Sequence, residues 1–253
     1  MKQKQLFKTT INVGCAFLLA ITIFSCNKED SPEPNNQGEK YIQRIDIYTT
    51  GSTSLSTVFL YNEQKQITQR ISSSPNLNTT TATFNYVGNK VSDIEIAVDG
   101  YKEIKTIDYD GGEYISVIES SYNNGNPNKS VFYRYDVEDN AYRIREGSFE
   151  TYVYLNEVGD PISSDLSLGT YEYDNTKKGP LYSFRDNFNF NSIKSVVLSG
   201  GPYVHPVTTF EYYFDDRTTT YQNKYDAEGY LIESEGTTIS SSYFKIEYTY
   251  TSL

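Results

Sequence analysis

From Tyr41 onward, apolar and polar residues alternate with a period of two along most of the sequence. In the clearest run every second position is aromatic or aliphatic: Phe244, Ile246, Tyr248 and Tyr250. Successive side chains of a β-strand point to opposite faces, so this alternation predicts half-buried antiparallel strands. The 25 tyrosines also suit the pleated surface of a sheet. We therefore predict an all-β fold.

Clusters of turn-forming residues separate the alternating runs, as in Asp110-Gly111-Gly112 and Glu228-Gly229. Glycine supplies the positive φ angles that tight strand reversals need. The pattern predicts an antiparallel meander of about seven or eight β-hairpins, curled into a half-barrel or open roll. A segment of this length can form one core. We expect residues 41–253 to form a single domain.

The turns belong to a repeated unit that joins an aromatic strand end, a polar turn and an aliphatic strand start. The clearest copy is Tyr225-Asp226-Ala227-Glu228-Gly229-Tyr230-Leu231, and a second copy begins at Tyr109. Weaker copies begin at Tyr61, Tyr86, Tyr135, Tyr154 and Tyr173. Their spacing of roughly 19 to 26 residues corresponds to one hairpin per unit, in an array whose units pack on their neighbours.

The N-terminus has the organisation of a lipoprotein signal peptide over residues 1–25. Three lysines precede an apolar run over residues 13–24, which is shorter than the roughly 20 residues that span a bilayer. Ser25 and Cys26 directly follow this run, so we expect cleavage before Cys26 and lipidation of Cys26. The alternatives are an uncleaved short anchor and a secretory peptide cut elsewhere. Residues 26–40 have the composition of a disordered tether.

The tyrosine-and-turn units resemble the YD (RHS-type) repeat, whose core is Tyr-Asp, two variable residues, Gly, one variable residue and Leu or Ile. The unit at Tyr225 matches this core in full. With its lipobox, the chain is similar to YD-repeat-like lipoproteins of Bacteroidota over about residues 41–253. The acidic pair Glu29-Asp30 resembles the export signal of surface lipoproteins in such bacteria. The resemblance implies a meander of hairpins that is anchored by lipid at the outer membrane and displayed at the cell surface. The alternative is that residues 26–40 are a linker facing the periplasm. The resemblance implies no activity.

The net charge and the cysteine content limit the kinds of partner and site that the chain can have. The net charge of −11 repels phosphate backbones, so we expect no nucleic-acid binding. The two cysteines are Cys15, inside the signal, and Cys26, so a disulfide, a zinc–thiolate site and a cysteine nucleophile are all excluded from the mature chain. We expect the lipid anchor at Cys26 to be the membrane contact, a glycan or another envelope protein to be the partner, and no cofactor.

Conventional catalytic motifs are absent from the sequence. His205 is the one histidine, in a Val-His-Pro context that is typical of a structural residue. Acid pairs such as Asp215-Asp216 or Asp108 with Asp110 would be needed for glycoside hydrolysis, but they fit solvated strands and turns equally well. Residues with oxygen ligands are grouped at positions 108–111 and 136–140. Calcium binding and turn formation explain these groups equally well.

One long excursion, residues 182–221, interrupts the repeat series. It is interpreted either as an insertion that plugs the curled sheet with aromatic side chains or as a binding loop. Exposed tyrosines can stack on sugar rings, and the candidate ligand-binding residues are Tyr203, Tyr213 and Tyr243. We therefore expect a non-catalytic binding module. The alternatives are a structural or assembly component of the envelope and a carboxylate-dependent glycoside hydrolase.

Overall fold

The computed structural model describes residues 38–49, 52–75, 77–111, 114–123, 125, 127–164, 169–185, 203–213, 217–237 and 242–253. All of them belong to the unit Gly38–Leu253. The predicted signal peptide, Cys26 and most of the tether lie outside the described residues, as do Asp215 and Asp216.

Strands make up most of the described chain, and the one helix is the short 3-10 turn η1 (Tyr182–Phe184). The strands are β1 (Lys40–Thr49), β2 (Ser52–Tyr61), β3 (Ile67–Ser74), β4 (Leu77–Val87), β5 (Lys90–Val98), β6 (Tyr101–Asp110), β7 (Tyr114–Tyr122), β8 (Pro127–Asp136), β9 (Ala141–Glu146), β10 (Phe149–Leu155), β11 (Pro161–Ser164), β12 (Gly169–Tyr173), β13 (Val207–Tyr212), β14 (Thr218–Thr220), β15 (Gln222–Tyr225), β16 (Leu231–Thr237) and β17 (Tyr243–Ser252).

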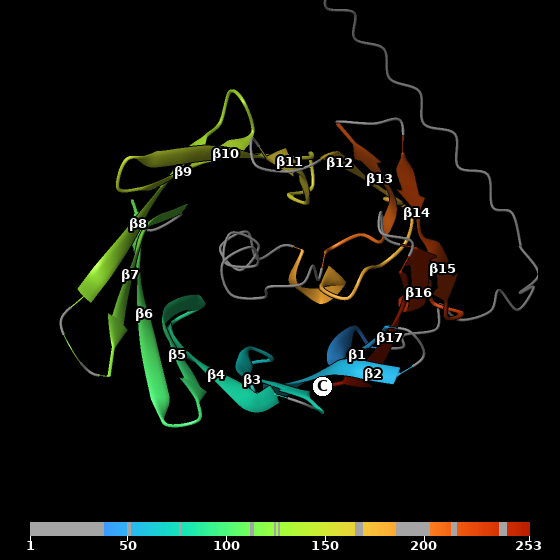
Figure 1. The fold of residues 1–253 in the computed structure, drawn as a ribbon, viewed down its shortest axis with the longest axis horizontal. Helices are drawn as coiled ribbons and strands as arrows, with labels where there is room; N and C mark the ends of the chain where they lie inside the picture. Colours follow the sequence, from blue (N-terminus) through green and yellow to red (C-terminus); the bar gives the residue numbers. More distant parts are fainter. Residues whose placement is uncertain are drawn as a thin grey trace, which may run out of the picture. The chain divides into compact units, whose positions relative to one another are not determined.

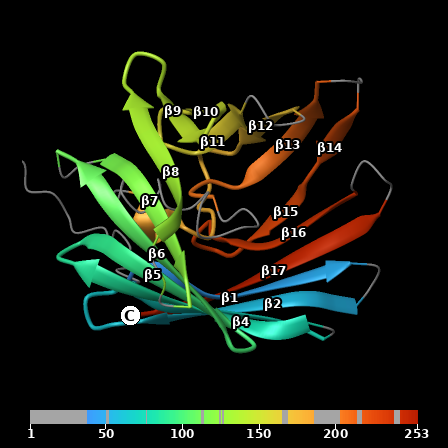
Figure 2. The ribbon, with the colours of Figure 1, turned by 60° about the vertical axis from the view of Figure 1, so that its left-hand side comes forward.

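Two antiparallel sheets contain these strands. The larger has 14 strands in the order β11-β10-β9-β8-β7-β6-β5-β4-β3-β2-β1-β17-β16-β15, and the smaller has the order β12-β13-β14. Nearly every strand pairs with its neighbour in sequence. The exception is the pairing of β1 with β17, from Lys40 opposite Ser252 to Thr49 opposite Phe244, which joins the two ends of the described chain. Figures 1 and 2 show that the large sheet is curved and that η1 lies on its concave side.

The all-β antiparallel meander is confirmed, but the number of hairpins was underestimated. Seven or eight hairpins correspond to at most sixteen strands, and the described residues contain seventeen in two sheets. The excursion is also shorter than predicted. Residues 207–212 and 218–220 form β13 and β14 of the small sheet, so these parts of the predicted excursion follow the strand pattern. Thr-rich stretches in these strands made a regular pairing hard to recognise.

One type of hydrogen bond recurs along the sheet and links strands next to successive tight turns. The hydroxyl of a tyrosine near the end of one strand donates to a backbone carbonyl at the start of the preceding strand, 2.5–2.8 Å away and 18 or 19 residues earlier in the sequence. The donor–acceptor pairs are Tyr61 to Ile42, Tyr86 to Ile67, Tyr109 to Val91 and Tyr250 to Leu231. A fifth bond, from Tyr173 on β12 to the carbonyl of Pro161 on β11, links the two sheets.

The geometry of the turns explains why these carbonyls are available. At Tyr61, Tyr86, Tyr109 and Tyr225 the strand register shifts by one residue, for example between Asn85 and Tyr86. Such an irregularity interrupts the ladder and leaves a backbone group without its usual partner. Since an unpaired buried carbonyl is costly, the tyrosine hydroxyl supplies the missing donor. The aliphatic residue after the turn, such as Val91, is buried opposite the tyrosine.

The main core lies on the concave face of the large sheet. It is built from buried aliphatic and aromatic residues of β1 to β7, including Ile42, Ile67 and Ile94, together with Leu181 and Phe184 from the η1 segment. The Phe184 ring packs 5.8 Å from that of Tyr41 and 6.3 Å from that of Tyr61. The start of the excursion therefore packs aromatic side chains against the sheet. Phe188, Phe190 and residues 196–198 of the same segment lie outside the described residues.

We predict that Tyr86→Phe lowers the free energy of unfolding by about 1–3 kcal/mol, because it leaves the Ile67 carbonyl without its donor. The matched control is Tyr213→Phe, which alters an exposed ring and is expected to change stability by less than about 0.5 kcal/mol. Urea unfolding of the two variants measures the difference. Equal effects would contradict a structural role for the hydroxyl.

Candidate functional site

A cavity of about 380 Å³ lies where the small sheet, the end of the excursion and the C-terminal strands meet. Its aromatic lining consists of Tyr171 on β12, Tyr203 and Tyr221 from the connecting segments, and Tyr248 on β17. Aliphatic side chains, prolines, Ser234 and His205 complete the wall. Small-molecule sites are commonly hollows of roughly 300–1,000 Å³ with an apolar lining and a few polar groups. The cavity fits that description.

Ring contacts hold the tyrosines of the cavity in place. The Tyr203 ring lies 5.8 Å from that of Tyr171 and 5.4 Å, edge to face, from that of Tyr173. Tyr171 in turn packs 4.5 Å from Phe210 on β13. Aromatic pairs at these distances add stability beyond the area they bury. The cavity wall is therefore a connected aromatic cluster.

Burial keeps the hydroxyls of Tyr203, Tyr221 and Tyr248 neutral. Desolvation raises the pKa of Tyr221 to about 12 and raises the pKa values of Tyr203 and Tyr248 well above the usual value. A neutral phenol can both donate and accept a hydrogen bond. The cavity thus offers polar contacts to a ligand without offering a tyrosinate charge.

The polar anchor of the site is a buried pair formed by Asp160 and His205. Nδ1 of His205 lies 2.8 Å from Oδ2 of Asp160, and both side chains are almost completely buried. The Asp160 carboxylate also accepts the backbone N–H groups of Val204, at 2.8 Å, and His205, at 3.2 Å. The Asp160 carboxylate, at the turn before β11, therefore holds Val204 and His205 in place. These residues directly follow Tyr203, which lines the cavity.

The three tyrosines proposed from the sequence lie in different surroundings. Tyr203 lines the cavity. Tyr213, just after β13, is exposed, and Tyr243 on β17 is exposed with its hydroxyl donating to Glu235 at 2.8 Å. Neither Tyr213 nor Tyr243 lines the cavity.

Sequence reasoning missed most of the other lining residues. Tyr248 is one of the alternating residues of β17, so its inward orientation was predictable, but its proximity to Tyr171 and Tyr221 was not. These residues come from strands far apart in the sequence. His205 lies in the wall as a buried partner of Asp160, a pairing that no local motif indicated.

The acidic candidates behave as turn and surface residues. Asp108 and Asp110 are exposed on β6. The Asp136 carboxylate accepts the backbone N–H groups of Glu138 and Asp139 at 3.0 and 3.4 Å, so it stabilises the turn before β9. Over the described ranges, no group of three or more His, Cys, Asp or Glu side chains is arranged to hold a metal ion.

Comparison with known proteins identifies no family. No protein-family model matches the sequence, and no curated protein matches it. Among solved structures, a porin-like protein from Bacteroides uniformis is similar, with 14% sequence identity, a TM-score of 0.39, and coverage of 83% of this chain and 98% of that chain. A TM-score this low supports no conclusion about function. In the part of the chain that the structure describes, no helix is both long and apolar enough to cross a membrane.

Proposed function

We propose that the protein is a lipoprotein of the outer membrane, anchored through Cys26 and displayed at the cell surface, that acts as a non-catalytic binding module. Its ligand binds in the tyrosine-lined cavity and is a small neutral molecule with hydroxyl groups, for which a saccharide is the leading candidate. The observation that carries this proposal is the 380 Å³ cavity itself.

Charge and chemistry of the cavity support a neutral ligand. The hydroxyls of Tyr203 and Tyr248 remain protonated because burial raises their pKa values, and His205, the one basic residue of the lining, is already paired with Asp160. Apolar walls formed by Leu231 and Ile246 suit the hydrocarbon face of a ligand, while hydroxyls suit its polar edge. A strongly charged ligand would lose its hydration there without gaining a counter-ion.

The two alternative functions, an assembly component of the envelope and a glycoside hydrolase, find less support. Assembly through strand pairing would favour long free edges, but the four sheet-edge strands β11, β12, β14 and β15 have three to five residues each. A carboxylate-dependent hydrolase needs two facing acids. Asp46 and Asp160 are the buried carboxylates among the described residues, and they bind Arg44 and His205 respectively.

We predict that the chain from Asn27 onward binds a member of a panel of neutral saccharides saturably, and that Tyr203→Phe weakens this binding about tenfold by removing one ligand hydrogen bond. Calorimetric titration measures both affinities. Tyr213→Phe is the matched control and should leave affinity unchanged. A panel without saturable binding, or equal losses in the two variants, would contradict the cavity as the binding site.

A second experiment, independent of ligand binding, tests the lipid anchor at Cys26. We predict that Cys26→Ser abolishes acylation and releases the protein from the membrane fraction, because stable anchoring requires several acyl chains. Cys15→Ser changes a cysteine inside the signal and should leave both lipidation and fractionation intact. Mass spectrometry and membrane fractionation give the readout. A Cys26→Ser protein that stays lipidated and membrane-bound would overturn the anchor assignment.

A further inference from the structure

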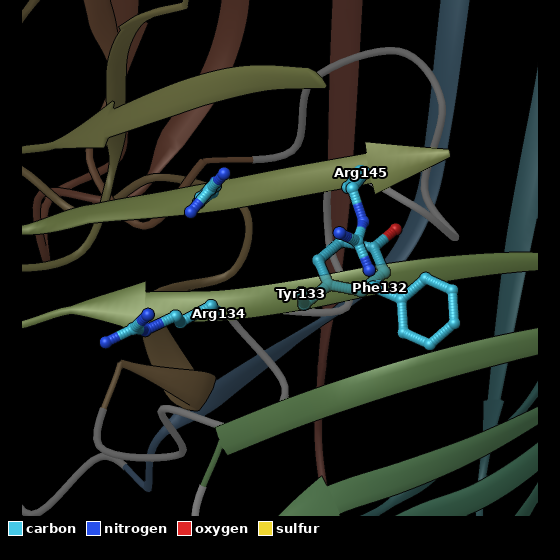
Figure 3. Close-up of a pocket in the computed structure, with 5 residues that line it drawn as sticks. Phe132, Tyr133, Arg134 and Arg145 are labelled. Atoms are coloured by element: carbon cyan, nitrogen blue, oxygen red, sulfur yellow. The ribbon is translucent and has the colours of Figure 1, made fainter. Parts of the chain in front are cut away.

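A second hollow, of about 220 Å³, lies on the β8–β9 hairpin and is rich in arginine (Figure 3). Phe132 and Arg134 come from β8, and Arg143 and Arg145 come from β9. In the strand register Phe132 lies opposite Arg145, and Arg134 lies opposite Arg143. Because side chains two residues apart share a face, these four side chains lie on the same face of the sheet.

The arrangement works against the stability of the hairpin. Two like charges directly opposite each other in an antiparallel pair are destabilising. Arg134 and Arg143 are such a pair, in a chain with 33 acidic and 22 basic residues.

Carboxylates compensate only part of this charge. Glu150 lies opposite Arg145 in the register, but its Oε2 contacts Nη2 of Arg143 at 2.5 Å. Among the residues that the structure describes, neither Arg134 nor Arg145 forms an ion pair. Within the described part of the chain, two positive charges around one hollow are therefore without a counter-ion.

The Arg145 guanidinium is held in position by an aromatic ring. Its central carbon lies 5.3 Å from the centroid of the Phe132 ring, a cation–π contact, and that ring is itself exposed. The contact restricts the long arginine side chain while leaving its N–H donors available. A fixed guanidinium loses less side-chain entropy when it binds a planar oxyanion.

We propose that this hollow is an oxyanion-binding site, which takes the carboxylate or sulfate group of an acidic saccharide between Arg134 and Arg145. Guanidinium groups bind such anions through paired, charge-assisted hydrogen bonds. The exposed Phe132 ring offers an apolar surface beside the anion for the sugar ring. The site is separate from the tyrosine-lined cavity: the two hollows share no lining residue.

The test uses the chain from Asn27 onward, titrated with a sulfated oligosaccharide, a uronate oligosaccharide and inorganic sulfate at low ionic strength. We expect at least one oligosaccharide to bind saturably, with affinity that falls as salt is added. Arg134→Gln with Arg145→Gln should weaken binding by about 100-fold or more, since the loss of each charge-assisted hydrogen bond weakens binding by about tenfold or more.

The control removes two positive charges elsewhere, through Lys65→Gln with Lys90→Gln, whose ammonium groups lie over the rings of Tyr41 and Tyr109. Binding should change less than about twofold in this control, as expected for screened charges at a distance. Absence of binding by all three probes, or equal losses in the two double variants, would overturn the proposal. Tyr203→Phe should leave this binding unchanged, so failure of one site is distinguishable from failure of the other.

Discussion

The hydrogen bonds from tyrosine hydroxyls to backbone carbonyls are the interaction on which the rest of the structure depends. At the turns that follow Tyr61, Tyr86 and Tyr225 the strand register shifts, and a carbonyl just after the turn accepts a hydrogen bond from a tyrosine 18 or 19 residues later. Phenylalanine and the aliphatic residues cannot do this, since they have no donor. The repeated tyrosine is therefore required by the backbone, and its ring fills the concave face at the same time.

A bond of the same kind helps to form the tyrosine-lined cavity. Tyr173 extends the pattern from the large sheet to the small one, and Asp160 holds the end of the excursion through His205 and two backbone amides. Together these contacts enclose a neutral, aromatic cavity. Other parts of the sheet carry ion pairs, as where Lys224 and Lys245 lower the pKa of Glu233 to about 2. Ion pairs at a protein surface contribute little to stability and mainly keep the surface soluble.

Local patterns in the sequence were sufficient to predict the all-β class and several of the strands and turns. Alternation in Phe244 to Tyr250 and the unit at Tyr225 identified β17 and the β15–β16 turn correctly. The small sheet was missed, because β13 and β14 contain mixed polar residues whose pairing with β12 depends on partners far along the chain. No local pattern in the sequence indicated the pairing of β1 with β17 either. For the site, Tyr203 was singled out, but the convergence of Tyr171, Tyr221 and Tyr248 depends on tertiary structure.

The most direct test of the tyrosine bonds is an alkaline titration of the intact protein, following tyrosinate absorbance together with circular dichroism. Burial raises the pKa of Tyr109 to about 12 and raises the pKa values of Tyr61, Tyr86 and Tyr250 further. A raised folded-state pKa gives stability that is complete below the unfolded value, about 10, and is lost as pH rises through the folded value. We predict that a subset of tyrosines resists ionisation beyond pH 10 and then ionises together with unfolding. Ionisation of all the tyrosines near pH 10 with the sheet intact would contradict the account.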